Sequence, residues 1–258
     1  MRWDPAQYAR YQSERNRPFF DLLGQVGAQS PGTVVDLGCG PGELTAAAGQ
    51  RWPSAQVLGL DSSLEMIERS AGYQGDRVRF ELADAAAFDA TGVDVLLSNA
   101  LLQWVPEHSR LLLDWAEQLN PDGWIAFAVP ANFDSPSHLL MRELAESARW
   151  SSQLAGTLRH ADAVRPAAEY LSLLTGAGLR VNAWQTRYLH LLTGPDPVLE
   201  WVRGTGLRPV LAALPADQAA EFEAEYRQQL RQAYPSEAFG TVFPFLRTFV
   251  VAHKGGSA

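Results

Sequence analysis

The residues with the clearest potential for chemistry form a glycine-rich turn, Val34-Val35-Asp36-Leu37-Gly38-Cys39-Gly40-Pro41-Gly42. The turn follows an apolar run of strand length and precedes a helical pattern that begins near Glu43. Glycine lets the backbone turn tightly and lets a ligand approach where a Cβ atom would clash. The following helix offers unpaired N–H groups and the positive end of its dipole. This context predicts a nucleotide-binding turn, although a G-x-G motif alone also occurs where glycine serves only packing.

Three features of the turn indicate which ligand it would hold. A dinucleotide motif reads G-x-G-x-x-G, whereas Gly42 comes one position early. Glu43 at the start of the helix would repel a pyrophosphate, and Asp36 could attract the cationic amino group of a methionine moiety. The turn therefore favours S-adenosylmethionine over NAD, with a nucleotide-dependent dehydrogenase as the disfavoured alternative.

Two more acidic residues follow the next two apolar runs. Asp61 follows residues 57–60 and could accept hydrogen bonds from both ribose hydroxyls. Asp84 follows residues 80–83 and could accept from an adenine amino group. Either carboxylate could instead cap a helix, a role that Asp performs well.

A fourth candidate position follows the run that ends at Leu97-Ser98-Asn99. Carbonyl groups there could accept hydrogen bonds from the methionine ammonium. Trp104 could either wall the site of methyl transfer or pack in the core. The candidate cofactor-binding residues are Asp36, Gly38, Gly40, Asp61, Ser62, Met66, Asp84, Ala85, Asn99 and Trp104.

The pattern of apolar residues predicts an α/β protein. Strands are expected at 33–37, 56–60, 78–82, 93–98, 124–129, 180–191 and 246–252, and helices at 43–51, 63–70, 108–119, 137–148, 165–175 and 215–233. Alternating strands and helices indicate a parallel sheet covered on both faces. The last two strands would complete a doubly wound, Rossmann-like sheet of seven strands. Inserted helices would then cap its carboxyl edge, where open α/β sheets bind ligands.

These patterns also suggest how the chain is divided. Residues 1–30 are expected to form a helical lid, with an interruption near Pro18. Residues 31–132 would form the cofactor-binding core, and residues 133–258 the helical cap together with the last two strands.

Composition limits the classes of partner. The net charge of −8 and a pI near 5.1 argue against nucleic acid, but a few convergent arginines could still bind a small anion. The single cysteine, Cys39, permits no intramolecular disulfide. No apolar run approaches the roughly 20 residues that span a bilayer, and the N-terminus lacks the apolar region of a signal peptide. We expect a cytoplasmic monomer or weak homodimer without membrane partners, and no metal, because the histidines lack metal-ligand spacing.

Longer stretches of the sequence extend the motifs. They include Trp3-Asp4-Pro5, Glu14-Arg15-Asn16-Arg17-Pro18, Gly59-Leu60-Asp61-Ser62-Ser63, Leu102-Gln103-Trp104, Met141-Arg142-Glu143, Tyr188 with His190, and Thr205-Gly206-Leu207-Arg208-Pro209. Through them the chain resembles the trans-aconitate methyltransferases, a family of class I methyltransferases, over nearly its whole length. The glycine turn is shared by all class I enzymes, whereas the first and last stretches are more specific. Leu101 and Glu43 replace small or polar residues of the family pattern.

The resemblance implies methyl transfer from S-adenosylmethionine to one carboxylate of trans-aconitate, a small anionic tricarboxylic acid. The products would be a monomethyl ester and S-adenosylhomocysteine. A carboxylate has a pKa of about 4 and is ionised at pH 7, so no acid–base residue is expected and Trp104 and Tyr8 would act by positioning. The alternatives are another small-molecule acceptor, carboxylic or not, and a cofactor-binding sensor without turnover.

The candidate residues for binding the acid are Tyr8, Arg15, Arg17, Tyr188, His190 and Arg208. Arginine suits this role because its guanidinium binds carboxylates in a bidentate manner. Structural roles remain open for them: Arg15 and Arg17 could pair with Glu14 or Asp21, Arg208 could be a surface residue, and His190 could be a buried structural histidine.

Overall fold

The structure, a computed structural model, describes residues 12–159 and 161–255. The chain forms two compact units. The core unit comprises the described residues of 16–130, 163–186 and 247–258, and the helical unit those of 1–15, 131–162 and 187–246. The division at residues 30 and 132 suggested by the sequence stays a prediction.

One sheet contains all seven described strands. They are β1 (Thr33–Leu37), β2 (Gln56–Asp61), β3 (Val78–Leu82), β4 (Val95–Asn99), β5 (Trp124–Pro130), β6 (Leu179–Leu192) and β7 (Thr241–Lys254). Their order is β3-β2-β1-β4-β5-β7-β6. Strands β1 to β5 are parallel, and β7 runs antiparallel to β5. The predicted seven-stranded α/β sheet is confirmed.

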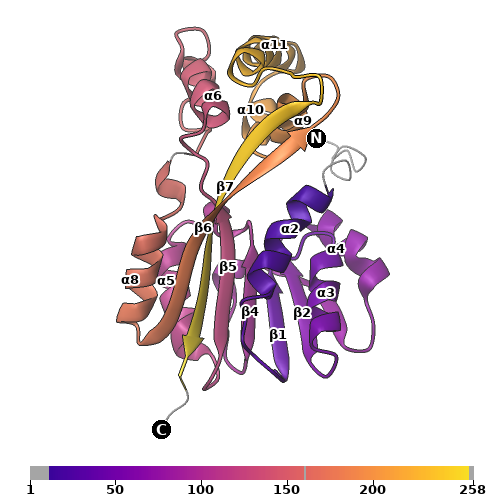
Figure 1. The fold of residues 1–258 in the computed structure, drawn as a ribbon, viewed down its shortest axis with the longest axis vertical. Helices are drawn as coiled ribbons and strands as arrows, with labels where there is room; N and C mark the ends of the chain where they lie inside the picture. The colour runs from indigo at the N-terminus through magenta and orange to yellow at the C-terminus, as the bar shows by residue number, and fades with distance from the viewer. Residues whose placement is uncertain (1–11, 160, 256–258) are drawn as a thin grey trace. The chain divides into compact units, whose positions relative to one another are not determined.

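Helices connect the parallel strands, as the alternating pattern predicts. The core unit contains α2 (Gln12–Leu23, from Asn16 onward), α3 (Glu43–Arg51), α4 (Leu64–Ser70), α5 (His108–Gln118) and α8 (Ala167–Gly176). In Figure 1, α3 and α4 flank the sheet on the β1–β2 side, and α5 and α8 lie beside each other on the other. Short 3₁₀ turns occupy Ala71–Tyr73, Ala85–Ala87, Leu102–Trp104 and Ala161–Ala163. No described helix is both long and apolar enough to cross a membrane.

Helix α2 passes through Pro18 without a break, so the interruption predicted there is wrong. Proline removes one backbone donor, at a cost of about 3 kcal/mol inside a helix. Phe19 and Leu22 are buried, and burying each such side chain contributes about 1.5–3 kcal/mol, which offsets that loss. Beyond the helix, Arg51 and Trp52 of the α3 end donate to the carbonyls of Val26 and Ala28, so this stretch is held against the core unit.

The helical unit is built on the far halves of the two long strands. Its helices are α6 (Pro136–Glu146), α7 (Ser151–Leu154), α9 (Pro197–Arg203), α10 (Arg208–Ala213) and α11 (Ala216–Ala233). They enclose a second hydrophobic core that includes Trp150, Phe222 and Phe243. Strands β6 and β7 therefore contribute to both units, because residues 187–192 and 241–246 belong to the helical unit.

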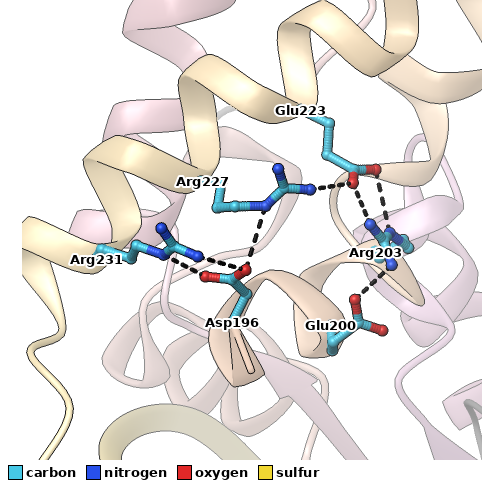
Figure 2. A network of polar contacts seen from close by, with 6 residues as sticks. All are labelled: Asp196, Glu200, Arg203, Glu223, Arg227 and Arg231. Atoms are coloured by element: carbon cyan, nitrogen blue, oxygen red, sulfur yellow. Dashed lines mark hydrogen bonds and ion pairs between the residues drawn. The ribbon is translucent and has the colours of Figure 1, made fainter. Parts of the chain in front are cut away.

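A charged network joins α9 to α11 within the helical unit (Figure 2). Its members are Asp196, Glu200, Arg203, Glu223, Arg227 and Arg231. Arg203 pairs with Glu200 and Glu223, and Arg227 pairs with Glu223 at 3.2 Å and with Asp196 at 3.3 Å. The Glu223 side chain is only 14% exposed, so water screens these contacts less than it screens ordinary surface pairs.

Candidate functional site

The glycine turn joins the end of β1 to the end of β2. The N–H groups of Gly38 and Cys39 donate to the carbonyl of Leu60 at 2.7 and 3.0 Å. Gly40 has a φ of +55°, and a Cβ atom built there would meet no described atom within 4 Å. A φ in this range favours glycine, and the open space beside Gly40 is room that a ligand could use.

Asp61 holds the turn in place from the end of β2. Its Oδ2 accepts from the N–H of Gly40 at 3.0 Å, and its Oδ1 accepts from the N–H of Ser63 at 2.9 Å. Each carboxylate oxygen has a second lone pair, so both could still accept from a ribose. Ser62 is exposed, and Met66 on α4 is half-buried.

Asp84 does act as a cap, the structural alternative left open by the sequence. Its Oδ1 accepts from the N–H of Ala86 at 2.9 Å at the start of the 3₁₀ turn Ala85–Ala87. Its second oxygen forms no hydrogen bond to any described residue. Asp84 is exposed and Ala85 is buried, so a cap and a contact to adenine are compatible at this position.

Asp36 is the most deeply buried acid of the candidate set, at 2% exposure. Its Oδ2 accepts a 2.6 Å hydrogen bond from the hydroxyl of Thr45 on α3. Burial raises the pKa of Asp36 to about 7, against the lowering effect of the Thr45 hydrogen bond and with a smaller increase from Asp61. Burial and these two carboxylates also raise the pKa of the neighbouring Cys39 thiol, so this cysteine is not an activated nucleophile.

Asn99 ends β4, and its Oδ1 accepts from Nη1 of Arg247 on β7 at 3.1 Å. The side chain of Arg247 is buried. Sequence reasoning missed this residue, although an arginine within the apolar run Phe245-Leu246-Arg247-Thr248-Phe249 is a signal that could have found it. Trp104 is 47% exposed, so the alternative that it is plain core packing is wrong.

The sheet brings the candidate cofactor residues to one edge. Strands β3, β2, β1 and β4 are adjacent and parallel, so Asp84, Asp61, Gly38 and Asn99 all follow or end strands at the carboxyl edge. The strand order reverses between β1 and β4, the kind of position where such sheets bind ligands. Three carboxylates and an open glycine turn fit a phosphate-free, cationic nucleoside, and S-adenosylmethionine is such a molecule.

The candidate residues for the acid are less clearly grouped. Tyr8 lies outside the described residues, and the side chain of Arg15 is not described either. Arg17 projects into solvent with 71% of its side chain exposed, and its Nε lies 3.9 Å from Oδ2 of Asp21. This is the surface ion pair that the sequence allowed as an alternative.

Tyr188 and His190 lie inside the helical unit, at 4% and 7% exposure. The rings of Tyr188 and His190 are 6.0 Å apart and nearly parallel, and the His190 ring stacks on Trp201 at 4.7 Å. His190 therefore has the surroundings of a packed structural histidine. Arg208 is exposed at the first residue of α10. No group of three or more potential metal ligands occurs in the described part of the chain.

Sequence reasoning also missed a polar cluster at the start of α6. Asn132 and Ser137 are buried there, and burial, followed by the charges of Arg142 and Arg159, lowers the pKa of His138 to about 4. The Ser-Pro-Ser sequence before His138 signals a helix start, but nothing in the sequence shows which distant residues surround it.

Comparison with known proteins identifies the family. Residues 8–183 match the model of a methyltransferase domain. The trans-aconitate 2-methyltransferase of Streptomyces avermitilis is 54% identical, covering 98% of this chain and 97% of the relative, and that of Mycolicibacterium gilvum is 52% identical, covering 97% and 98%.

Solved structures show the same fold at low sequence identity. The YcgJ protein of Bacillus subtilis is 16% identical, with a TM-score of 0.58 over 94% of this chain and 100% of that one. Phosphoethanolamine N-methyltransferase 2 of Haemonchus contortus, solved with S-adenosylhomocysteine, has a TM-score of 0.54 at 16% identity, over 93% and 52% of the two chains. With an acidic carboxyl edge suited to S-adenosylmethionine and relatives more than half identical over almost its full length, this chain belongs to the trans-aconitate 2-methyltransferase family.

Proposed function

We propose that this protein methylates one carboxylate of trans-aconitate, giving a monomethyl ester and S-adenosylhomocysteine. The observation that carries the proposal is the 54% identity, over 98% of the chain, to a protein named trans-aconitate 2-methyltransferase. The acidic carboxyl edge supports the cofactor half of the reaction, because Asp36, Asp61 and Asp84 suit the amino, ribose and adenine groups in turn.

The reaction needs positioning rather than proton transfer. S-adenosylmethionine supplies an electrophilic methyl group on a sulfonium. The new bond joins a carboxylate oxygen to the methyl carbon, and the carbon–sulfur bond breaks with its electron pair going to sulfur. The carboxylate is ionised already, so no general base is required. In the proposed mechanism, residues of this chain orient the acid, which can supply a large part of the rate enhancement.

The cations should bind the carboxylates that do not react. A tight ion pair on the attacking oxygen would weaken it as a nucleophile, whereas pairs on the other two carboxylates orient the acid at no such cost. Arg15, Arg17 and Arg208 are proposed for this role, with Tyr8, Tyr188 and His190 as hydrogen-bond donors and Trp104 walling the site. Arg208 is exposed at the start of α10.

The test is initial-rate methyl transfer from labelled S-adenosylmethionine to trans-aconitate, with cis-aconitate, isocitrate and citrate as comparison acceptors. The expected result is label incorporated fastest with trans-aconitate and released by mild base, because an ester is base-labile and an ether or a methylated amine is not. Faster transfer to a neutral phenol would overturn the assignment. Tight S-adenosylhomocysteine binding without transfer to any acid would favour a sensor.

A further inference from the structure

A cluster of polar and cationic side chains in the helical unit has no place in the mechanism so far. It lies around the first turns of α6 and is anchored through Ser137. The hydroxyl of Tyr226 donates to the carbonyl of Ser137 at 2.7 Å, and the hydroxyl of Tyr234 accepts from its N–H at 3.0 Å. Because both backbone groups of Ser137 are held by buried tyrosines, the turn that carries His138 has a fixed position.

The ring of His138 has one occupied and one available nitrogen. Around Nδ1 lie Nδ2 of Asn132 at 3.3 Å and the hydroxyls of Ser135 and Ser137 at 3.3 and 3.2 Å. With the Asn132 amide oriented as described, its nitrogen donates to Nδ1, and this assignment places the ring proton on Nε2. No described residue forms a hydrogen bond to Nε2. His138 is therefore a neutral side chain with a donor that no described group uses.

The charges of two arginines, Arg142 and Arg159, act on this ring. Arg142 follows one helical turn later on α6, and its side chain is 13% exposed. Arg159 is partly buried, and this burial lowers the pKa of its guanidinium to about 10. Asp134 lies 4.0 Å from Nη2 of Arg142, but its side chain is 85% exposed and is screened by water. The cluster is thus cationic within an acidic protein.

Two further features indicate a place for a ligand. Asn132 is 4% exposed, and its Oδ1 has no hydrogen-bond partner among the described residues. A buried amide oxygen is normally paired with protein or ordered water. Gly206 lies against His138, because a Cβ atom built on it would be 3.4 Å from Nε2. A side chain at Gly206 would therefore press on the Nε2 edge of the ring.

We propose that His138 and Arg142 form a binding site for one non-reacting carboxylate of the acid substrate, with Arg159 adding positive charge to its surroundings. The Arg142 guanidinium pairs with the carboxylate, Nε2–H of His138 donates to it, and a water bound with it donates to Oδ1 of Asn132. This inference rests on the proposed function and assigns part of its substrate recognition to the helical unit. Carboxylates and guanidinium groups are well matched in charge and geometry.

The test combines variants with acceptors. Arg142→Gln should raise the KM for trans-aconitate at least about tenfold, since it removes a charge-assisted contact. Its affinity for S-adenosylhomocysteine should not change, because the candidate cofactor residues lie in the core unit. Arg149→Gln is the matched control: Arg149 is a helical-unit arginine that pairs with Glu221 and Glu225 on α11, and its loss should not alter this KM.

The acceptor series makes the test independent of folding. Glutaconate, itaconate and mesaconate each lack a different one of the three carboxylates of trans-aconitate. The analogue that lacks the methylated carboxylate should not react and serves as a blank. If Arg142 binds one of the other two carboxylates, Arg142→Gln should lower kcat/KM for trans-aconitate and for the analogue that keeps the bound carboxylate, but not for the analogue that lacks it. A partly unfolded variant would lose the same factor with all of them, because inactive protein lowers every rate equally.

The outcomes separate this inference from the proposed function. If the unaltered protein methylates trans-aconitate and Arg142→Gln loses the same factor with all acceptors, or nothing, the carboxylate site is wrong and the function stands. If the unaltered protein methylates no acid, the proposed function is wrong. The carboxylate site then stands only if trans-aconitate raises the thermal midpoint of the unaltered protein but not that of Arg142→Gln, and it is wrong if trans-aconitate shifts neither midpoint or both.

Discussion

The hydroxyl of Thr45 donates a 2.6 Å hydrogen bond to the carboxylate of Asp36, and both side chains are buried. Burial alone favours the neutral acid, whereas this hydrogen bond favours the ionised form. The balance puts the pKa of Asp36 at about 7. The charge proposed to attract the amino group of the cofactor is therefore only partly present near neutral pH before the cofactor binds.

Thr45→Val should shift the pH dependence of cofactor binding upward. Without the hydrogen bond, the pKa of Asp36 rises further, so a smaller fraction is ionised at pH 7. A hydrogen bond to a charged group contributes about 1.5–3 kcal/mol, which corresponds to roughly tenfold or more in affinity. Calorimetric titration with S-adenosylhomocysteine between about pH 6 and pH 9 measures the shift. Thr241→Val, a buried threonine in the helical unit, is the control, and an unshifted profile for Thr45→Val would remove the role assigned to this bond.

Asp36→Asn should stabilise the ligand-free protein at alkaline pH while weakening cofactor binding. Because the folded-state pKa of Asp36 is raised, the folded protein binds a proton that the unfolded chain has released between about pH 4 and pH 7. The contribution of Asp36 to stability is therefore lost as pH rises through this window, and asparagine has no such loss. Urea unfolding of both proteins at several pH values checks the sign. The free energy of unfolding of Asp36→Asn, relative to that of the unaltered protein, should grow as pH rises, and a decrease would contradict this prediction. Asp114→Asn changes a half-exposed residue and should show no comparable trend.

Asp61 and Asp36 should be distinguishable with a truncated ligand. Asp61→Asn places an amide nitrogen against the N–H of either Gly40 or Ser63, which donate to the two Asp61 oxygens, and it also removes an acceptor proposed for the ribose. Binding of adenosine and of S-adenosylhomocysteine should both weaken by about tenfold or more. Asp36→Asn should weaken only S-adenosylhomocysteine, because adenosine has no amino acid group. Equilibrium dialysis with both ligands tests this, and equal losses in the two variants would mean that the assignments to ribose and amino group are wrong.

Glu223→Gln should destabilise the helical unit by about 1–3 kcal/mol. Glu223 accepts from both Arg203 and Arg227 (Figure 2), and its side chain is largely buried. Removing its charge leaves these two arginines without a full countercharge in a partly buried place. Thermal unfolding measures the loss. Removal of the exposed i,i+4 pair of Arg110 and Asp114 by Asp114→Asn should cost less than about 0.5 kcal/mol. Equal losses of stability in the two variants would show that the network stabilises the protein no more than an ordinary surface ion pair does.

Most of the core unit could be predicted from the sequence because its signals are local. Strands β1 and β3 and helix α3 have the predicted bounds, since each is a short apolar or periodic run between clear breakers. The start of β7 was missed by five residues, and Pro244, which lacks an N–H for strand pairing, makes that stretch resemble a loop.

The parts that escaped prediction depend on residues far apart in the chain. Arg247 meets Asn99 from 148 positions away, and Tyr226 meets Ser137 from 89 positions away. No periodicity encodes such contacts. The glycine turn predicts its ligand from local sequence because the backbone itself would form the site, whereas the proposed recognition of the acid depends on side chains that only the tertiary fold brings together.

The continuity of β6 and β7 through both units has a consequence for engineering. The helical unit is not one continuous segment of the chain. Its residues include 131–162, which precede β6, and 187–246, which run from within β6 into β7. A chimera that exchanges residues 131–258 with a relative would also replace α8 and the halves of β6 and β7 that complete the core sheet. If the helical unit recognises the acid as proposed, a graft meant to exchange this part of acceptor recognition would have to carry residues 131–162 together with residues 187–246, with both junctions on the strands kept in register.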